Sequence, residues 1–152
     1  MTLAETASNF CEIMMRDAAL SSASPVEERA IIEASLQDAC QVVVDITSRY
    51  LFEEEVFERR NERELSADEL CEIMVTAQVA TYGDGLEPER LHPYMWAVKP
   101  HYYSSVFYNF PYMFGLLFGL GVYAQYRQEP DGFIDRYQAL LSSTGMEDAA
   151  GL

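Results

Sequence analysis

The stretch HPYMWAVKPHYYSSVFYNFPYMFGLLFGLGVYAQY, residues 92–126, decides which fold and which function this chain can have. Between His101 and Tyr126 it contains no Asp, Glu, Lys or Arg. Both histidines of the chain, His92 and His101, lie in it, followed by Tyr102, Tyr103, Tyr108, Tyr112, Tyr123 and Tyr126. Such a segment can be a membrane span, a buried core helix, or the wall of a site that uses tyrosine hydroxyl groups.

The membrane interpretation requires about 18 or more consecutive apolar residues. The longest run without Tyr, Asn, Ser, Pro or a charge is only Met113–Val122. Gly115 and Gly119 have the spacing of a membrane helix-packing motif, but a helix that is apolar on all sides can equally be the central helix of a protein in water. We therefore predict no membrane partner and keep a membrane-associated helical protein as an alternative.

The core interpretation rests on helical spacing of apolar side chains. Phe107, Phe110, Phe114 and Phe118 follow one another at steps of three or four residues. The same reasoning predicts a second set of core residues, namely Leu116, Leu117, Leu120 and Val122. We expect the glycines of this segment to let a neighbouring helix approach closely, since glycine otherwise weakens a helix; they are Gly115, Gly119 and Gly121.

Composition and charge limit the class of protein. The 152 residues are enough for one domain with a core, and the net charge of −15 argues against a nucleic-acid partner. Residues 1–90 carry 20 acidic and 7 basic side chains, whereas residues 91–152 carry 5 and 3. This asymmetry is typical of a solvated helical layer beside a buried segment.

The cysteines indicate a reducing compartment. Cys11, Cys40 and Cys71 are odd in number and form no CxxC pair, which favours free thiols over a disulfide framework or a cysteine zinc site. The chain opens with an amphipathic segment that contains Glu5, not with a basic start and an apolar run. These features predict a cytoplasmic protein.

The helix signals predict an all-α fold of about five helices, one of them very long. Ser24 with Glu27 and Ser66 with Glu69 have capping-box spacing, and the glycines at 83–85 indicate a helix end. We expect a kink in the long helix, although no Gly or Pro locates it. The predicted helices span residues 3–20, about 25–64, 66–82, 109–128 or 111–128, and about 132–143, with an irregular Pro- and Tyr-rich segment over residues 83–106.

The tyrosines and the histidine that precede the apolar helix can also form a site. Buried phenols need hydrogen-bond partners, and His and Tyr can each donate a hydrogen bond to a developing oxyanion. The side chains concerned, in a loop leading into a helix, are His101, Tyr102, Tyr103, Tyr108 and Tyr112.

Two stretches resemble a known family. LAETASNFCE at residues 3–12 and KPHYYSSVFYNFPYMFGLLFGLGVYAQY at 99–126 resemble the oligoendopeptidase F family, which are thimet-oligopeptidase-like zinc metallopeptidases. The resemblance extends through YRQEPDGFIDRYQALLSSTG at 126–145 and covers essentially the whole chain. It implies hydrolysis of peptide bonds in short peptides, with zinc as the cofactor.

The resemblance also implies roles for individual residues. Glu5 would be the third zinc ligand in a motif that resembles E-x-x-S-x-F-x-E. Glu12 would orient that ligand without itself binding the zinc. His101, Tyr103 and Tyr108 would be catalytic, and Tyr102 and Tyr112 would bind substrate. Phe110 stands where many relatives have tyrosine, so no hydroxyl is available there.

The chain departs from the family in lacking H-E-x-x-H. His92 and His101 are nine residues apart and separated by prolines, so they cannot replace histidines on successive helical turns. We therefore expect a single helical unit over residues 1–152 that is the C-terminal portion of a metallopeptidase catalytic domain. It would be inactive alone and would hold no zinc tightly. The alternatives are a non-catalytic helical interaction module and a degenerate split peptidase.

Such a fragment would leave apolar helix faces uncovered. Contiguous apolar patches above a few hundred Å² are uncommon on monomers. The sequence therefore predicts a homo-oligomer whose interface comes largely from residues 99–126. The candidates for uncovered side chains are Phe10, Met14, Phe114, Leu117 and Phe118.

Overall fold

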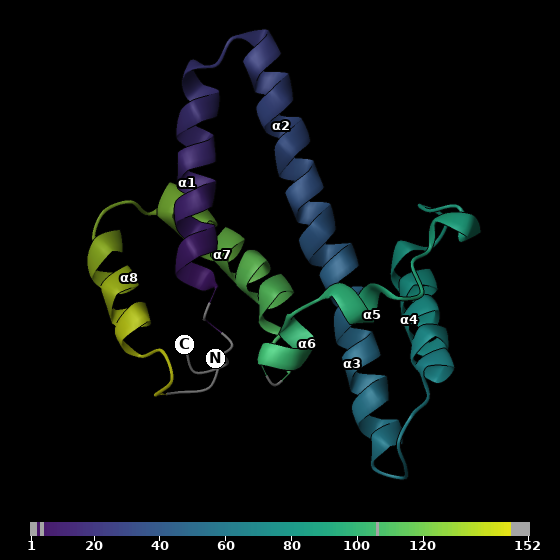
Figure 1. Cartoon of the computed structure of the whole chain (residues 1–152). Helices are drawn as coiled ribbons and strands as arrows, with labels where there is room; N and C mark the ends of the chain where they lie inside the picture. Colours follow the sequence, from purple (N-terminus) through teal and green to yellow (C-terminus); the bar gives the residue numbers. More distant parts are fainter. Residues whose placement is uncertain (1–2, 4, 106, 147–152) are drawn as a thin grey trace. The chain divides into compact units, whose positions relative to one another are not determined.

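The computed structural model describes residues 3, 5–105 and 107–146, and within them the fold is all-α with no β-strand, as predicted (Figure 1). The helices are α1 Thr6–Ser22, α2 Pro25–Cys40, α3 Ile46–Arg60, α4 Ala67–Tyr82, α5 Met95–Val98, α6 His101–Ser104, α7 Pro111–Gln128 and α8 Phe133–Ser142. A 3-10 turn at Pro88–Arg90 lies in the irregular segment.

The very long helix is confirmed, and its interruption is a π-helical turn. The helical run extends from Pro25 to Arg60, which is 36 residues. Gln41–Asp45 forms the π turn between α2 and α3. Because neither glycine nor proline is involved, the position of this turn could not be found from helix-breaking residues.

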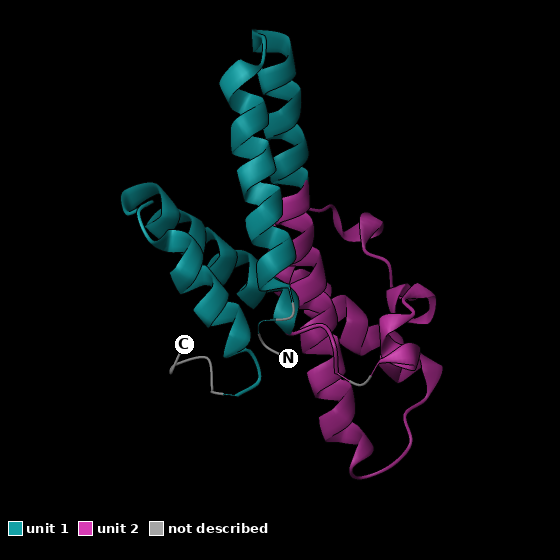
Figure 2. Cartoon of the chain, turned by 90° about the vertical axis from the view of Figure 1, so that its left-hand side faces the viewer, with its two compact units in different colours: residues 1–37, 111–152 teal, residues 38–110 magenta. Residues whose placement is uncertain are grey.

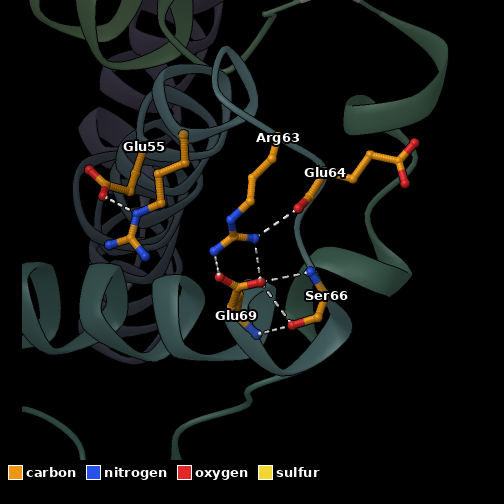
Figure 3. A network of polar contacts seen from close by, with 6 residues as sticks. Glu55, Arg63, Glu64, Ser66 and Glu69 are labelled. Atoms are coloured by element: carbon orange, nitrogen blue, oxygen red, sulfur yellow. Dashed lines mark hydrogen bonds and ion pairs between the residues drawn. The ribbon is translucent and has the colours of Figure 1, made fainter.

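Both predicted capping boxes are present. The Ser24 N–H donates to Glu27 Oε2 at 2.8 Å, and the Glu27 N–H donates to Ser24 Oγ at 3.5 Å. Ser66 and Glu69 make the same reciprocal pair at the start of α4. Figure 3 shows Arg63 joining this second box, with Nη1 donating to Glu69 Oε2 at 3.1 Å. Gly83 ends α4 with a φ of 56°, a conformation that favours glycine.

The helices divide into two compact units where the sequence predicts one (Figure 2). Unit 1 contains residues 1–37 and 111–152, and unit 2 contains residues 38–110. The first boundary lies within the long helix, and the second lies directly before α7.

The core of unit 1 is aromatic. Phe10, Val122 and Phe133 are buried together, and the rings of Tyr126 and Tyr137 pack around them. The ring centroids of Phe10 and Tyr137 are 4.7 Å apart, and those of Phe10 and Phe133 are 5.5 Å apart. The prediction that Phe10 belongs to an uncovered surface is therefore wrong, because α7 and α8 cover its ring.

Two glycines bring α1 and α7 into close contact. A Cβ on Gly115 would lie 2.8 Å from the Cβ of Glu5, and one on Gly119 would lie 3.2 Å from the Cβ of Asn9. Gly115 faces Glu5, and Gly119, four residues later, faces Asn9, four residues after Glu5. The two segments therefore run in the same direction. The prediction of close helix approach is confirmed for these two glycines. It is wrong for Gly121, because an added Cβ there would have no neighbour from another described element within 4 Å.

On another side of α7, two of the predicted core residues, Leu117 and Leu120, are exposed. Val122 is buried, but Leu117 is 57 % exposed and Leu120 is 40 % exposed. With Met113, they occur at steps of four and three residues, which places them on one side of α7. Leu117 was also predicted on an uncovered surface, and that prediction is confirmed, as is Met14 on α1.

Unit 2 is built on the packing of α3 against α4. Phe52 from α3 is buried with Ile73, Met74 and Ala77 from α4. Partly buried side chains from the irregular segment complete the cluster, among them Met95, Trp96 and Tyr102. The Gln78 side chain ties this segment to α4, since it donates to the His92 carbonyl and accepts from the His92 N–H, both at 2.9 Å.

Candidate functional site

The predicted site residues belong to both units. Glu5, Glu12 and Tyr112 lie in unit 1, and His101, Tyr102, Tyr103 and Tyr108 lie in unit 2. The prediction that the HYY stretch lies in a loop is wrong, because its three residues form most of the short helix α6. Pro100 precedes this helix and fixes a backbone conformation that suits its first turn.

Within unit 2, Tyr102 is partly buried against the core, whereas Tyr103 is exposed. The Tyr102 hydroxyl donates to the Arg49 carbonyl at 3.4 Å, and its ring lies 5.1 Å from that of Phe52. Burial raises the pKa of Tyr102 above its ordinary value. Tyr103 is 66 % exposed, and its hydroxyl donates to the Trp96 carbonyl at 3.1 Å.

These two tyrosines line a cleft of about 330 Å³ in unit 2, which we call the Trp96 cleft. Its volume is at the lower end of the range for small-ligand sites. The aromatic part of its wall consists of Phe52, Phe57, Trp96, Tyr102 and Tyr103. Its charged side chains are Glu53, Arg60 and Glu64.

A buried carboxylate, Glu53, holds the segment that carries Tyr108. Glu53 is only 5 % exposed, and its Oε2 accepts a hydrogen bond from Asn109 Nδ2 at 2.9 Å. Burial raises the pKa of the Glu53 carboxyl, and the hydrogen bonds from Asn109 and from the backbone N–H groups of Phe107 and Asn109 oppose that rise, as does the charge of His101. Phe107 has a φ of 51°, which is uncommon for a residue other than glycine.

A second polar pair precedes Glu53 in the sequence: Arg49 lies one helical turn before it and Asp45 lies two turns before it. Arg49 is 4 % exposed and pairs with Asp45. Tyr82 donates to Asp45 Oδ1 at 3.0 Å, and burial, together with the charge of Asp45, raises the pKa of Tyr82 to about 12.

Sequence reasoning missed Asp45, Arg49, Glu53 and Asn109. The signal that could have found three of them is the four-residue spacing of Asp45, Arg49 and Glu53, which places all three on the helix face that also carries Phe52. Charged side chains on an apolar face are buried only when they are paired.

In unit 1, the residues that follow Glu5 in its motif contact it directly. The Glu5 carbonyl accepts from Ser8 Oγ at 3.0 Å and from Asn9 Nδ2 at 2.6 Å, and Ser8 Oγ also donates to Glu5 Oε2 at 3.4 Å. Glu12 is exposed and Tyr112 is half-buried. Tyr112 is three residues before Gly115, so both lie toward the α1 side of α7.

Metal-ligating side chains do not cluster in the described part of the chain. Among those residues no group of three or more His, Cys, Asp or Glu side chains could hold a metal ion. A catalytic zinc site normally uses three protein ligands, so Glu5 alone does not satisfy the requirement.

Comparisons with protein-family models, with curated proteins and with solved structures find no match to this chain. The resemblance to the oligoendopeptidase F family therefore rests on the quoted residues alone. A search of the described helices finds none that is both long enough and apolar enough to cross a membrane.

Proposed function

We propose that this chain supplies one metal ligand and the substrate-binding wall of a zinc-dependent oligopeptidase that hydrolyses short peptides. Glu5 is the proposed ligand, and Glu12 is proposed to orient Glu5 without itself binding the metal. His101, Tyr103 and Tyr108 are the proposed hydrogen-bond donors to the oxyanion of the tetrahedral intermediate. Tyr102 and Tyr112 are proposed to contact the peptide. Because the sequence contains no H-E-x-x-H, the two histidine ligands would come from outside these 152 residues.

One observation carries the proposal. The two stretches on which the resemblance rests are about a hundred residues apart along the chain, yet they pack against each other as α1 and α7. Gly115 and Gly119 allow this contact, and the tightest point of it is at Glu5. A ligand must be held in a fixed position to bind a metal, and close contact of the Glu5 backbone with α7 provides that support.

The first test is the coding sequence that precedes Met1. An in-frame H-E-x-x-H there, or in a partner chain, would supply the two histidines and the general base. In the protein that contains both segments, we expect Glu5→Gln to abolish zinc binding and peptide turnover, whereas the matched variant Glu28→Gln on α2 should retain both. Full activity of Glu5→Gln would contradict the ligand assignment.

The tyrosine and histidine roles have their own test. In that same protein, Tyr103→Phe or His101→Ala should lower kcat more than it raises KM, because these donors act mainly in the transition state. Known oxyanion donors contribute about 2.7–4 kcal/mol each. If both variants kept the wild-type kcat, the two side chains would serve packing alone. The chain by itself, given zinc and quenched-fluorescent peptides, is expected to show no turnover.

A second candidate function is that of a non-catalytic helical interaction module. The observation that favours it is the exposed apolar side of α7, formed by Met113, Leu117 and Leu120. Exposed apolar patches commonly mark protein–protein contacts. Self-association without any activity of the extended protein would favour this function over the peptidase.

A further inference from the structure

The Trp96 cleft combines an aromatic wall with carboxylates. Five aromatic side chains line it, and Trp96 is the only tryptophan of the chain. The faces of aromatic rings carry partial negative charge and attract cations, tryptophan most strongly. A carboxylate beside such rings strengthens the attraction, since it adds a full negative charge at short range.

The position of each charged group favours one class of ligand. Glu53 is buried in the wall, and Glu64 and Arg60 are exposed. Figure 3 shows the Glu64 side chain extending away from the Arg63–Glu69 pair, so its carboxylate is not part of that network. Two carboxylates and one guanidinium give the cleft a negative balance, and unit 2 as a whole is acidic, with 14 acidic and 6 basic side chains in residues 38–110.

Contacts in the structure hold the aromatic wall in shape before any ligand arrives. The Tyr103 hydroxyl is bonded to the Trp96 carbonyl, and the Tyr102 hydroxyl is bonded to the Arg49 carbonyl. The ring of Phe57 packs on Phe107 with centroids 5.6 Å apart. Because these rings are already placed, binding would order few side chains, and such preorganisation favours affinity.

We propose that the Trp96 cleft binds an organic cation, namely a guanidinium or ammonium group on an apolar stem such as the side chain of arginine or lysine. The stem would lie against Phe52, Phe57 and Trp96, and the charged group would lie near Glu53 and Glu64. Tyr102 and Tyr103 line this cleft and also belong to the proposed peptidase site, but the inference rests on the cleft itself, and its test measures binding without peptidase activity.

The test is a fluorescence titration of the intact chain, in which Trp96 is the reporter. The probe is N-acetyl-arginine amide, and the matched neutral probe is N-acetyl-citrulline amide, which has nearly the same shape. We expect a saturable change in Trp96 emission with the arginine probe and about tenfold weaker binding of the citrulline probe, as loss of a cation–π contact and an ion pair implies. Equal affinity for the two probes would overturn the proposal.

Charge variants at two positions should change the affinity for the arginine probe in opposite directions. An effect on binding can thereby be separated from an effect on folding. Glu64→Gln should weaken binding of the arginine probe about two- to fivefold, and Arg60→Gln should strengthen it by a similar factor, since exposed charge pairs have effects of that size. Glu58→Gln, on α3 but outside the cleft, should leave the affinity unchanged. Phe57→Leu, which keeps an apolar side chain but removes a ring, should also weaken binding about two- to fivefold.

Helix content and unfolding midpoint of each variant are measured alongside, so that a variant that fails to fold is recognised. The reverse signs at Glu64 and Arg60, or tighter binding of N-acetyl-glutamate amide than of the arginine probe, would assign the cleft to anions and overturn the proposal. No saturation by the arginine probe with folded wild-type protein would overturn it as well.

Discussion

Glu53 shows how a single charged side chain can organise an irregular segment. Its carboxylate accepts hydrogen bonds from the Asn109 side chain and from the backbone N–H groups of Phe107 and Asn109. These bonds satisfy a group that would otherwise be costly to bury. They also hold Phe107 in its unusual backbone conformation, and Tyr108 lies between the two donors. The position of Tyr108 therefore depends on a residue from α3.

Glu53 should affect how stability varies with pH. Its pKa in the folded state is above the ordinary value of 4.5. From about pH 4.5 up to the folded pKa, the folded protein thus keeps a proton that the unfolded chain has lost. The free energy of unfolding should therefore fall as the pH rises through this range.

Glu53→Gln should remove that fall, as measured by urea denaturation at a series of pH values. Glu54→Gln, the exposed neighbour on α3, is the control and should leave it in place. The raised pKa would be contradicted if the free energy of unfolding of the wild type rose with pH over this range and Glu53→Gln removed that rise.

Gly115 and Gly121 form a matched pair on α7. An alanine at 115 would place its Cβ 2.8 Å from the Glu5 Cβ and 3.3 Å from the Glu5 carbonyl carbon, and neither atom can move freely. We expect Gly115→Ala to destabilise the protein by about 1–3 kcal/mol, as overpacking typically does. In Gly121→Ala the new Cβ meets no other element of the described chain within 4 Å, so this variant should be more stable by about 1 kcal/mol through helix propensity. Thermal unfolding measures both; equal stabilisation would show that α1 and α7 are not in close contact.

At the scale of helices, local signals predicted most boundaries. Ser24, Ser66 and Gly83 act on the backbone within a few residues, so their effects can be predicted without knowledge of the fold. The four-residue helix α6 was missed because it is too short to show helical periodicity. In α7 almost every residue is apolar, so the sequence predicted Leu117 both in the core and on an uncovered surface, and only the structure shows that it is exposed.

The capping box of α4 should contribute to stability in a defined pH range. Arg63 and Ser66 hydrogen-bond to Glu69 and lower its pKa from 4.5 to about 2. This contribution is therefore present above about pH 4.5 and is lost as the pH falls toward 2. At pH 7, Ser66→Ala should cost about 0.5–2 kcal/mol in the free energy of unfolding. Ser21→Ala, whose hydroxyl donates to a carbonyl within α1, is the control and should cost less. An equal cost in the two variants would argue against the cap.

At the scale of the whole molecule, the candidate site was only partly predictable. The tyrosines and the histidine could be singled out because they are concentrated in one apolar stretch. Glu53 and Asn109 are 56 residues apart, and no local pattern joins them. Long-range polar contacts of this kind depend on how the chain folds back, so the residues that support a site are harder to predict than those that form it.

The charge distribution and the apolar side of α7 together favour self-association. Met113, Leu117 and Leu120 are exposed on one side of α7, and residues 91–152 carry only 5 acidic and 3 basic side chains. Charge repulsion is therefore weak where apolar side chains are exposed. We expect a homodimer or higher oligomer by sedimentation equilibrium in moderate salt.

Leu117→Glu should shift that equilibrium toward monomer, because it would place a charge in the apolar contact. Val26→Glu on α2 is the control, since Val26 is 80 % exposed and does not belong to this side of α7. A 17.3 kDa monomer of the wild type at tens of micromolar would contradict the prediction.

The π turn at Gln41–Asp45 has a consequence for insertions and deletions. Its hydrogen bonds span one residue more than those of an α-helix, so the turn contains one surplus residue. Deleting Val43 should convert it to an α turn and leave the side chains of α2 and α3 at nearly the same positions around the helix axis, because the surplus residue is accommodated within that single turn. None of the α2 residues is buried, so we expect a loss of no more than about 1 kcal/mol in the free energy of unfolding. Deleting Glu54 instead would put Phe52 and Glu53 out of register with Val56, and should prevent folding. Changes of length in this helix are therefore tolerated at one place, which its composition does not reveal.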